Sequence, residues 1–174
     1  MEIQPAGIFK DPSAQWAYMD DVAGDAGIYA RESDYLDCFI QLGIAQGRVI
    51  SVTFPASEPE DAQHDHDLLD RIQAYLEGAE DDFADVTVAL TVPTDQRGVL
   101  ETVRDIPYGT QVSVEKVARM TVGLDPGDEA DLTLVRQALD DNPAPIFIPD
   151  HRVRDGPSAA PAAVEQKLRA VEGL

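Results

Sequence analysis

Cysteine is almost absent from this sequence of 174 residues, in which Cys38 is the single example. One thiol excludes an internal disulfide and a Cys-x-x-Cys metal site. Cys38 lies in a segment with the pattern of a β-strand, so a buried structural thiol is the favoured interpretation and a reactive nucleophile is the weaker alternative.

Long hydrophobic runs are also missing. Apolar stretches such as residues 86–92 are far shorter than the ~20 residues that a membrane-spanning helix requires. The N-terminus shows no basic segment followed by an apolar core, which is the pattern of a secretory signal. We therefore expect a soluble cytoplasmic protein that has no membrane partner.

Basic residues are scarce, and lysine above all. The chain carries 33 acidic and 13 basic residues, three of them lysines, for a net charge of −20 and a pI near 4.2. Such a charge repels nucleic acid and acidic membranes at ordinary ionic strength. The acidic residues are spread along the whole chain, which is typical of a halophilic protein working in molar salt, where the Debye length is about 3 Å. An ordinary acidic bacterial protein is the alternative.

The first half of the chain has the pattern of a small α/β domain. Strands are predicted over residues 27–31, 36–43 and 48–54, with a tight hairpin connection between the last two. Apolar residues at helical spacing predict a helix over residues 67–77. We assign residues 1–90 to this domain, and we expect its final segment to pack onto the second domain as it crosses to it.

The second half, residues 91–174, is predicted to be helical. A first helix from Thr94 ends near residue 105, before Ile106-Pro107, because the residue before a proline avoids the α-helical region. Ser113 is a candidate N-cap for a helix over residues 114–120, and another helix follows over residues 129–140. Two short helices joined by a turn fit a helix-turn-helix, with residues 129–140 in the position of the recognition helix.

One segment carries the clearest functional signal. From Pro143 to Val153 the chain reads Pro-Ala-Pro-Ile-Phe-Ile-Pro-Asp-His-Arg-Val, which resembles the Pro-Cys-His-Arg active-site signature of the O6-alkylguanine-DNA alkyltransferases. Ile-Pro-Tyr-Gly at residues 106–109 and Leu-x-x-x-Glu-Gly at residues 168–173 match further parts of that family in order and spacing. The resemblance implies an N-terminal ribonuclease-H-like α/β domain, a C-terminal helical domain with a winged-helix-like helix-turn-helix, and no cofactor.

Asp150 occupies the position of the reactive cysteine of the family. A carboxylate is a far weaker nucleophile than a thiolate, so we expect no alkyl transfer. The resemblance maps the His-Glu relay of the family onto His151 and Glu172 and its loop-stabilising asparagine onto Asn142. Either these residues are a degenerate catalytic site, or they hold the last helix against the loop by buried hydrogen bonds. We favour the second interpretation.

The residues that flip and hold a damaged base are replaced as well. The family's arginine finger corresponds to Thr133, and its base-rotating tyrosine corresponds to Val114, so the resemblance makes both residues candidate positions of DNA contact. The Gly-rich lid is absent, and the chain between His151 and Glu172 is shorter than is usual in the family. Since base flipping costs a few kcal/mol and needs both a wedge and a pocket, these losses also argue against repair chemistry.

The function predicted from these observations is weak, non-catalytic association of a monomer with DNA in a repair context, with a repair protein as a further candidate partner. Phosphate contacts are expected from the candidate residues Arg136, Gln137, Arg152 and Arg154. The alternative is a protein-interaction module that no longer binds DNA, and a minor alternative is a hydrolase that uses Asp150 and His151. A continuous basic strip over residues 129–140 and 152–154 would favour DNA, whereas an acidic surface there would argue against it.

A possible metal motif is the weakest signal. Residues 64–67 read His-Asp-His-Asp, which are metal-binding residue types. They lie in an acidic stretch immediately before a predicted helix, where such side chains also act as caps and first-turn charges. A solvated segment is therefore favoured over a metal site.

Overall fold

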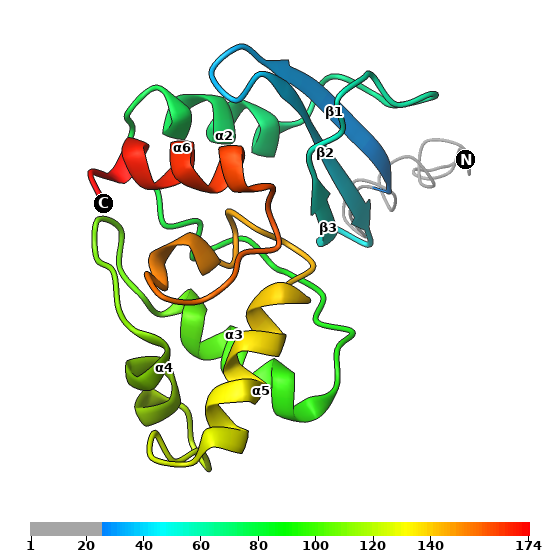
Figure 1. Cartoon of the computed structure of the whole chain (residues 1–174). Coiled ribbons are helices and arrows are strands. Elements are labelled where there is room, and N and C mark those ends of the chain that lie inside the picture. The colour runs from blue at the N-terminus through cyan, green and yellow to red at the C-terminus, as the bar shows by residue number, and fades with distance from the viewer. Residues whose placement is uncertain (1–25) are drawn as a thin grey trace, which may run out of the picture.

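The computed structural model describes residues 26–174 and begins with a small antiparallel sheet (Figure 1). Its strands are β1 (Gly27–Ser33), β2 (Cys38–Ala45) and β3 (Arg48–Thr53), in the spatial order β1-β2-β3. The first 25 residues of the predicted α/β domain lie outside the described residues.

The two hairpin connections explain where the strands begin and end. Gln46 and Gly47 form the second connection with φ angles of 54° and 73°, the backbone that a two-residue hairpin of the right twist requires. In the first connection the N–H of Asp37 donates to the Ser33 carbonyl, and Asp37 has a φ of 59°. Leu36 therefore lies in a turn, although it is buried, and the strand predicted from residue 36 begins at Cys38.

Helix α2 (Asp67–Leu76) packs its apolar side against the sheet. His66 caps the helix, because its Nδ1 accepts from the Leu68 N–H at 3.0 Å. The buried residues of α2 are Leu69, Ile72 and Tyr75, at the three-residue spacing of one helical face. The predicted helix is confirmed to within one residue.

The segment between the two halves contacts both of them. Its backbone pairs with β3, since the Val49 N–H donates to the Thr87 carbonyl and the Ala89 N–H donates to the Val49 carbonyl. The ring of Phe83 lies 5.1 Å from that of Phe147 in an edge-to-face arrangement. The predicted contact with the C-terminal half is therefore present, whereas the pairing with β3 was not predicted.

Three helices build the lower half of Figure 1: α3 (Thr94–Arg104), α4 (Val114–Met120) and α5 (Glu129–Asp140). All three pack against one another. Ser113 caps α4 as predicted, with its Oγ accepting from the Lys116 N–H at 3.0 Å. The boundaries of these helices agree with the sequence predictions because each has a clear cap or a following proline.

The chain closes with a short 3-10 helix η1 (Asp150–Arg152) and helix α6 (Ala162–Glu172). Helix α6 returns across the molecule to lie beside α2 (Figure 1). The hydroxyl of Tyr35 donates to the Lys167 carbonyl at 3.2 Å, so the last helix is tied to the first hairpin.

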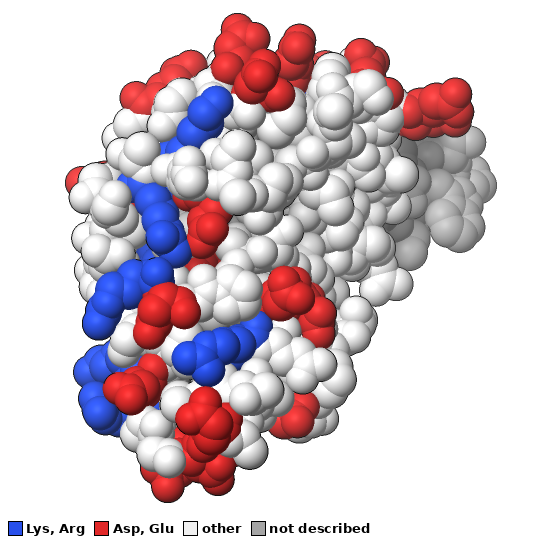
Figure 2. All heavy atoms as spheres, in the orientation of Figure 1, with Lys and Arg blue, Asp and Glu red and all other residues white. Residues whose placement is uncertain are grey.

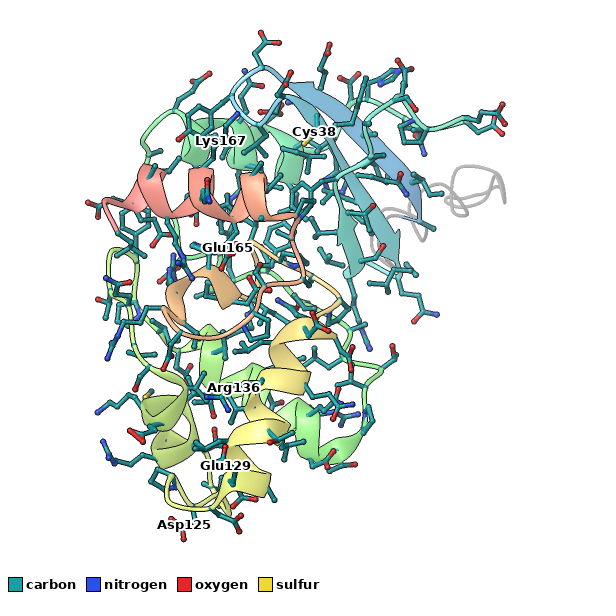
Figure 3. All side chains as sticks on the ribbon, in the orientation of Figure 1. Cys38, Asp125, Glu129, Arg136, Glu165 and Lys167 are labelled. Carbon is teal, nitrogen blue, oxygen red and sulfur yellow. The ribbon has the colours of Figure 1, made fainter. Side chains whose placement is uncertain are left out.

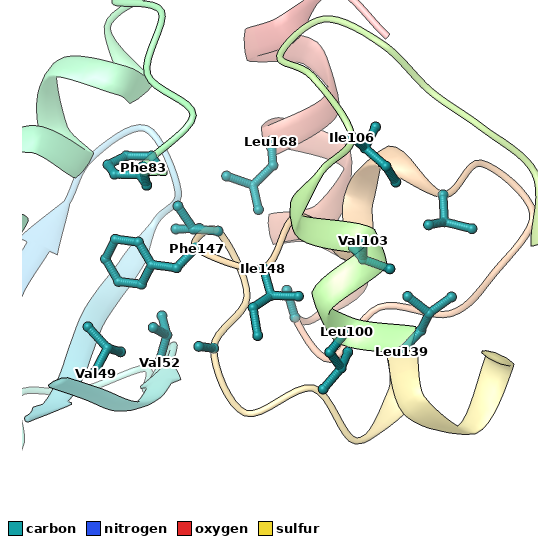
Figure 4. Close-up of a cluster of buried hydrophobic side chains, with 14 of the residues drawn as sticks. Val49, Val52, Phe83, Leu100, Val103, Ile106, Leu139, Phe147, Ile148 and Leu168 are labelled. Atoms are coloured by element: carbon teal, nitrogen blue, oxygen red, sulfur yellow. The ribbon is translucent and has the colours of Figure 1, made fainter. Parts of the chain in front are cut away.

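One buried apolar cluster runs from the sheet to the helices (Figure 4). Val49 and Val52 of the sheet lie on one side of it, Phe147 lies between, and Leu100 and Leu139 lie on the helical side. The predicted fold class, an N-terminal α/β part followed by a helical part, is confirmed. No helix in residues 26–174 is long and apolar enough to cross a bilayer.

Candidate functional site: a buried carboxylate and a glutamate clamp

The loop before η1 is held by Asn142, which is 4% exposed. Its Nδ2 donates to the Ile148 carbonyl and to Oδ2 of Asp150, both at 3.0 Å, and its Oδ1 accepts from the Ala144 N–H at 3.0 Å. Ile146 in the same loop has a φ of 82°, a strained value for a β-branched residue. Asn142 therefore supplies the hydrogen bonds that keep a strained loop in one conformation, as the resemblance implied.

Asp150 lies at the start of η1 and is completely buried. Both carboxylate oxygens are occupied, because Oδ1 accepts from Ser158 Oγ at 2.6 Å and Oδ2 accepts from the Ala159 N–H at 2.9 Å and from Asn142. Burial raises the pKa of Asp150 above its ordinary value, and the three hydrogen bonds act in the opposite direction. The side chain in the cysteine position thus fastens the segment after η1 to the loop before it.

Glu172, at the end of α6, is the centre of a second buried cluster, which we call the glutamate clamp. Arg152 donates to it twice, from Nε at 2.8 Å and from Nη2 at 3.0 Å, and His151 Nε2 lies 2.7 Å from Oε2. The Gly109 N–H donates to Oε1 at 2.9 Å, and the hydroxyl of Tyr75 donates to Oε2. Burial alone pushes the pKa of Glu172 upward, but these donors outweigh it and hold the pKa at about 2.

The clamp joins four separate parts of the chain. His151 and Arg152 come from η1, Gly109 from the turn after α3, Tyr75 from α2 and Glu172 from α6. The same contacts raise the pKa of Tyr75, first through burial and then through the neighbouring Glu172. The pairing of His151 with Glu172 that the resemblance implied is present, within a set of donors that locks α6 onto the loop.

Two parts of the clamp differ from the sequence predictions. Arg152 was expected to contact DNA phosphates, but it is 2% exposed, and its Nη1 donates to the Ile106 carbonyl at 2.7 Å. That expectation is corrected, because a guanidinium occupied by Glu172 and a carbonyl inside the protein cannot reach a phosphate. Tyr75 was missed, although its three-residue spacing from Ile72 placed it on the buried face of α2.

His151 is fully buried and makes its contacts through Nε2. Its Nδ1 atom is buried with no hydrogen-bond partner among the described residues. The second contact of Nε2 is the hydroxyl of Tyr75, 3.3 Å away. The imidazole is therefore fixed by its Nε2 side alone.

The remaining candidates for DNA contact fall into two groups. Thr133, Arg136 and Gln137 lie on the exposed side of α5, and Arg154 is exposed directly after η1. Val114 is buried at 1% exposure, so its side chain is unavailable to any ligand, which corrects its inclusion among the contact residues. The structure therefore separates the interior of the site, around Asp150 and Glu172, from an outer surface on α5.

The outer surface carries charges of both signs. Arg136 is exposed on α5, but its Nη1 lies 3.9 Å from Oε2 of Glu129, and Asp140 is exposed on the same helix. Figure 2 shows Lys and Arg side chains along one edge, over α4, α5, the segment after η1 and α6, with acidic side chains between them. Arg136 lies on this face (Figure 3). We call the exposed members the basic row: Lys116, Arg119, Arg136 and Arg154.

The histidines of the His-Asp-His-Asp segment have structural contacts. His66 caps α2, and His64 places Nδ1 3.2 Å from the Ala30 carbonyl and Nε2 3.5 Å from Glu58. Among residues 26–174, no group of three or more His, Cys, Asp or Glu side chains is arranged to hold a metal ion.

Comparison with known proteins connects this site to a family. The profile of the DNA-binding domain of 6-O-methylguanine DNA methyltransferase matches residues 94–171. Methylated-DNA–protein-cysteine methyltransferase of Methanopyrus kandleri is 34% identical over 109 residues, which are 62% of this chain and 78% of that protein. The chain belongs to this family. In the Pro-Cys-His-Arg signature that the sequence resembles, the residue of this chain at the position of the cysteine is Asp150.

Solved structures of the family share the fold. Mycobacterium tuberculosis OGT, solved in complex with DNA, superposes with a TM-score of 0.62 at 21% identity over 84% of this chain and 91% of that chain. The O6-methylguanine-DNA methyltransferase of Pyrococcus kodakaraensis gives 0.61 at 19% identity over 85% of this chain and all of the other. The architecture of this family member is thus shared with these solved structures.

Proposed function

We propose that this family member associates with DNA in a repair context without transferring alkyl groups. The observation that carries the proposal is Asp150, which is buried at the cysteine position with both oxygens hydrogen-bonded inside the protein. A carboxylate in that state cannot attack an alkyl group from outside, whereas the basic row remains exposed to a duplex.

The distribution of charge supports contact with DNA through the C-terminal half. Residues 1–90 contain nineteen acidic and four basic residues, while residues 91–174 contain fourteen and nine. The net charge is therefore −15 in the first part and −5 in the second, so the second part repels a phosphate backbone less than the first does. A phosphate backbone meets the least repulsion at the basic row.

In this proposal α4 and α5 act as a helix-turn-helix, with α5 facing the duplex. The contacts come from Arg136 and Gln137 of α5, from Arg154, and from Lys116 and Arg119 of α4, all of which are exposed. Thr133 stands on the same surface and is too short to enter a base stack. Binding is accordingly electrostatic and gives little preference for an alkylated base.

The hydrolytic alternative receives no support from the geometry. An aspartyl ester requires a free carboxylate oxygen beside an open site, and the oxygens of Asp150 accept from Ser158, Ala159 and Asn142. Asp150 is 0% exposed. The interaction-module alternative draws on a different observation, since the acidic residues Glu129 and Asp140 are exposed on α5.

Fluorescence anisotropy tests the proposal with a plain duplex and with the same duplex carrying O6-methylguanine, at the lowest salt that keeps the protein folded. We expect similar, weak affinity for both, falling with added salt. Removing Arg136 and Arg154 together (Arg136→Ala, Arg154→Ala) should lower the slope of log affinity against log salt by about 2. Arg48→Ala is the control, because Arg48 is exposed on β3.

Two results would refute the proposal. Undetectable binding to both duplexes would leave the interaction module as the function. Strong preference for the alkylated duplex would show that a lesion pocket exists outside the site described above.

A further inference from the structure

A cavity of about 290 Å³ opens at the end of the molecule opposite to α4 and α5. It lies between the β1–β2 connection and α2, and its walls include Glu32, Asp34 and Tyr35 from the hairpin side and Glu77 from just beyond α2. This volume is at the lower end of the range of small-ligand pockets, roughly 300–1,000 Å³, and leaves room for one long side chain.

The floor of the cavity is apolar and fixed. Ile40 of β2 is 4% exposed and Leu69 of α2 is 1% exposed, and both belong to the main core. Tyr35, at the rim, is 41% exposed, and its hydroxyl is bonded to the backbone of α6. An aliphatic chain entering the cavity would therefore contact side chains that are already held in place.

The rim of the cavity is negative. Neither Glu32 nor Asp34 has an ion-pair partner within the part of the chain that the structure describes, and Glu77 has only a long hydrogen bond of 3.4 Å from Gln73. Figure 2 shows acidic side chains gathered around this end of the molecule.

The cations near the cavity are already engaged. Arg31 lines it, but one nitrogen of its guanidinium lies 2.7 Å from Asp70, and another donates to the His64 carbonyl at 3.0 Å. Lys167 places its Nζ 5.7 Å from the centre of the Tyr35 ring. The carboxylates of Glu32 and Asp34 are therefore left to attract a cation from outside.

We propose that this cavity receives an arginine or lysine side chain from a basic segment of a partner protein. Such a side chain has an apolar stem that suits Ile40 and Leu69 and a charged end that suits the rim. Residues 26–90 carry fourteen acidic and three basic residues, and this net charge of −11 complements a basic partner beyond the cavity itself. The proposal does not depend on DNA binding, and the distance between this cavity and α5 in Figure 1 leaves both surfaces accessible together.

The test uses the full chain and a fluorescein-labelled peptide, Gly-Ser-Leu-Arg-Lys-Arg-Leu-Ser-Gly. The comparison peptide has citrulline in place of arginine and norleucine in place of lysine. We expect the basic peptide to bind and the neutral one to bind at least about tenfold more weakly, which corresponds to the loss of a contact ion pair. On the protein labelled with ¹³C in its methyl groups, the methyl resonances of Ile40 and Leu69 should shift.

The double variant Glu32→Gln, Asp34→Asn should bind the basic peptide about tenfold more weakly than the wild type does. The matched control is Glu60→Gln, Asp65→Asn, which removes the same charge from exposed positions outside the cavity and should change the affinity by less than about twofold. Equal weakening by both double variants would refute the site, because it would show attraction to the net charge alone. Binding without movement of the Ile40 and Leu69 resonances would refute insertion into the cavity, and equal affinity for the neutral peptide would refute the choice of a cation.

Discussion

Glu172→Gln, a change at the centre of the glutamate clamp, should lower the stability of the folded protein. This change keeps the shape of the side chain and removes its charge, leaving Arg152 buried without a counterion. The pKa of Glu172 is about 2 in the folded protein against an ordinary value of 4.5, which corresponds to about 3 kcal/mol of stabilisation at pH 7. Breaking a buried ion pair by removing one partner costs roughly 3–5 kcal/mol, which is of the same magnitude.

The direction of the pH dependence follows from the lowered pKa of Glu172. The stabilisation is complete above the unfolded-state pKa and is lost as the pH falls toward the folded-state pKa of about 2. The difference between the wild type and Glu172→Gln should therefore shrink to about 2 kcal/mol at pH 3.5. Asp150 has a raised pKa and contributes with the opposite sign, but it is present in both proteins and cancels in the difference.

Urea unfolding followed by circular dichroism, in molar potassium chloride and between pH 7 and pH 3.5, measures these values. The control is Glu165→Gln on the same helix, because Glu165 pairs with Arg169 across one turn in a partly exposed position, 2.8 Å apart. That pair should be worth less than about 1 kcal/mol. A loss below about 1 kcal/mol for Glu172→Gln at pH 7, or a loss that is the same at both pH values, would refute the account of the clamp.

Three further predictions concern Asp150, the dependence of stability on salt, and the packing around two glycines. Asp150→Cys should give no burst of alkyl transfer in single-turnover assays with labelled O6-methylguanine DNA, because Thr133 stands at the position of the family's arginine finger. A burst would show that the loss of the base-flipping residues matters little. We propose that the chain is halophilic, so its melting temperature should rise strongly between 0.1 M and molar potassium chloride, and a flat response would contradict this. Gly156→Ala should destabilise the folded protein by about 1–3 kcal/mol, because the new Cβ would lie 2.7 Å from Leu139 Cδ1. Gly98→Ala in α3 should stabilise it by about 0.5–1 kcal/mol, because the nearest atom to the new Cβ would be 3.8 Å away. Urea unfolding of both variants measures the contrast.

The sequence predicted most of the secondary structure because the local signals were strong. Ser113 caps α4 as expected, and the Gln46-Gly47 connection has the backbone of a tight hairpin. Helix α5 follows its predicted bounds. The predicted start of β2 was wrong by two residues, because Leu36 is buried like a strand residue but lies in a turn.

The sequence by itself also determined the family and the lost thiol, because both depend on residue identity at matched positions. The sequence did not show which polar side chains are buried or which groups they contact. Arg152 is a residue type that binds phosphate. Only the structure shows that its guanidinium contacts Glu172 of α6 and the Ile106 carbonyl in the turn after α3, inside the protein. Tyr75 lies 97 residues from Glu172 along the chain, a contact that no local pattern encodes. Tertiary structure decides such cases because a charged group binds whichever opposite charge the packing leaves next to it once water is excluded.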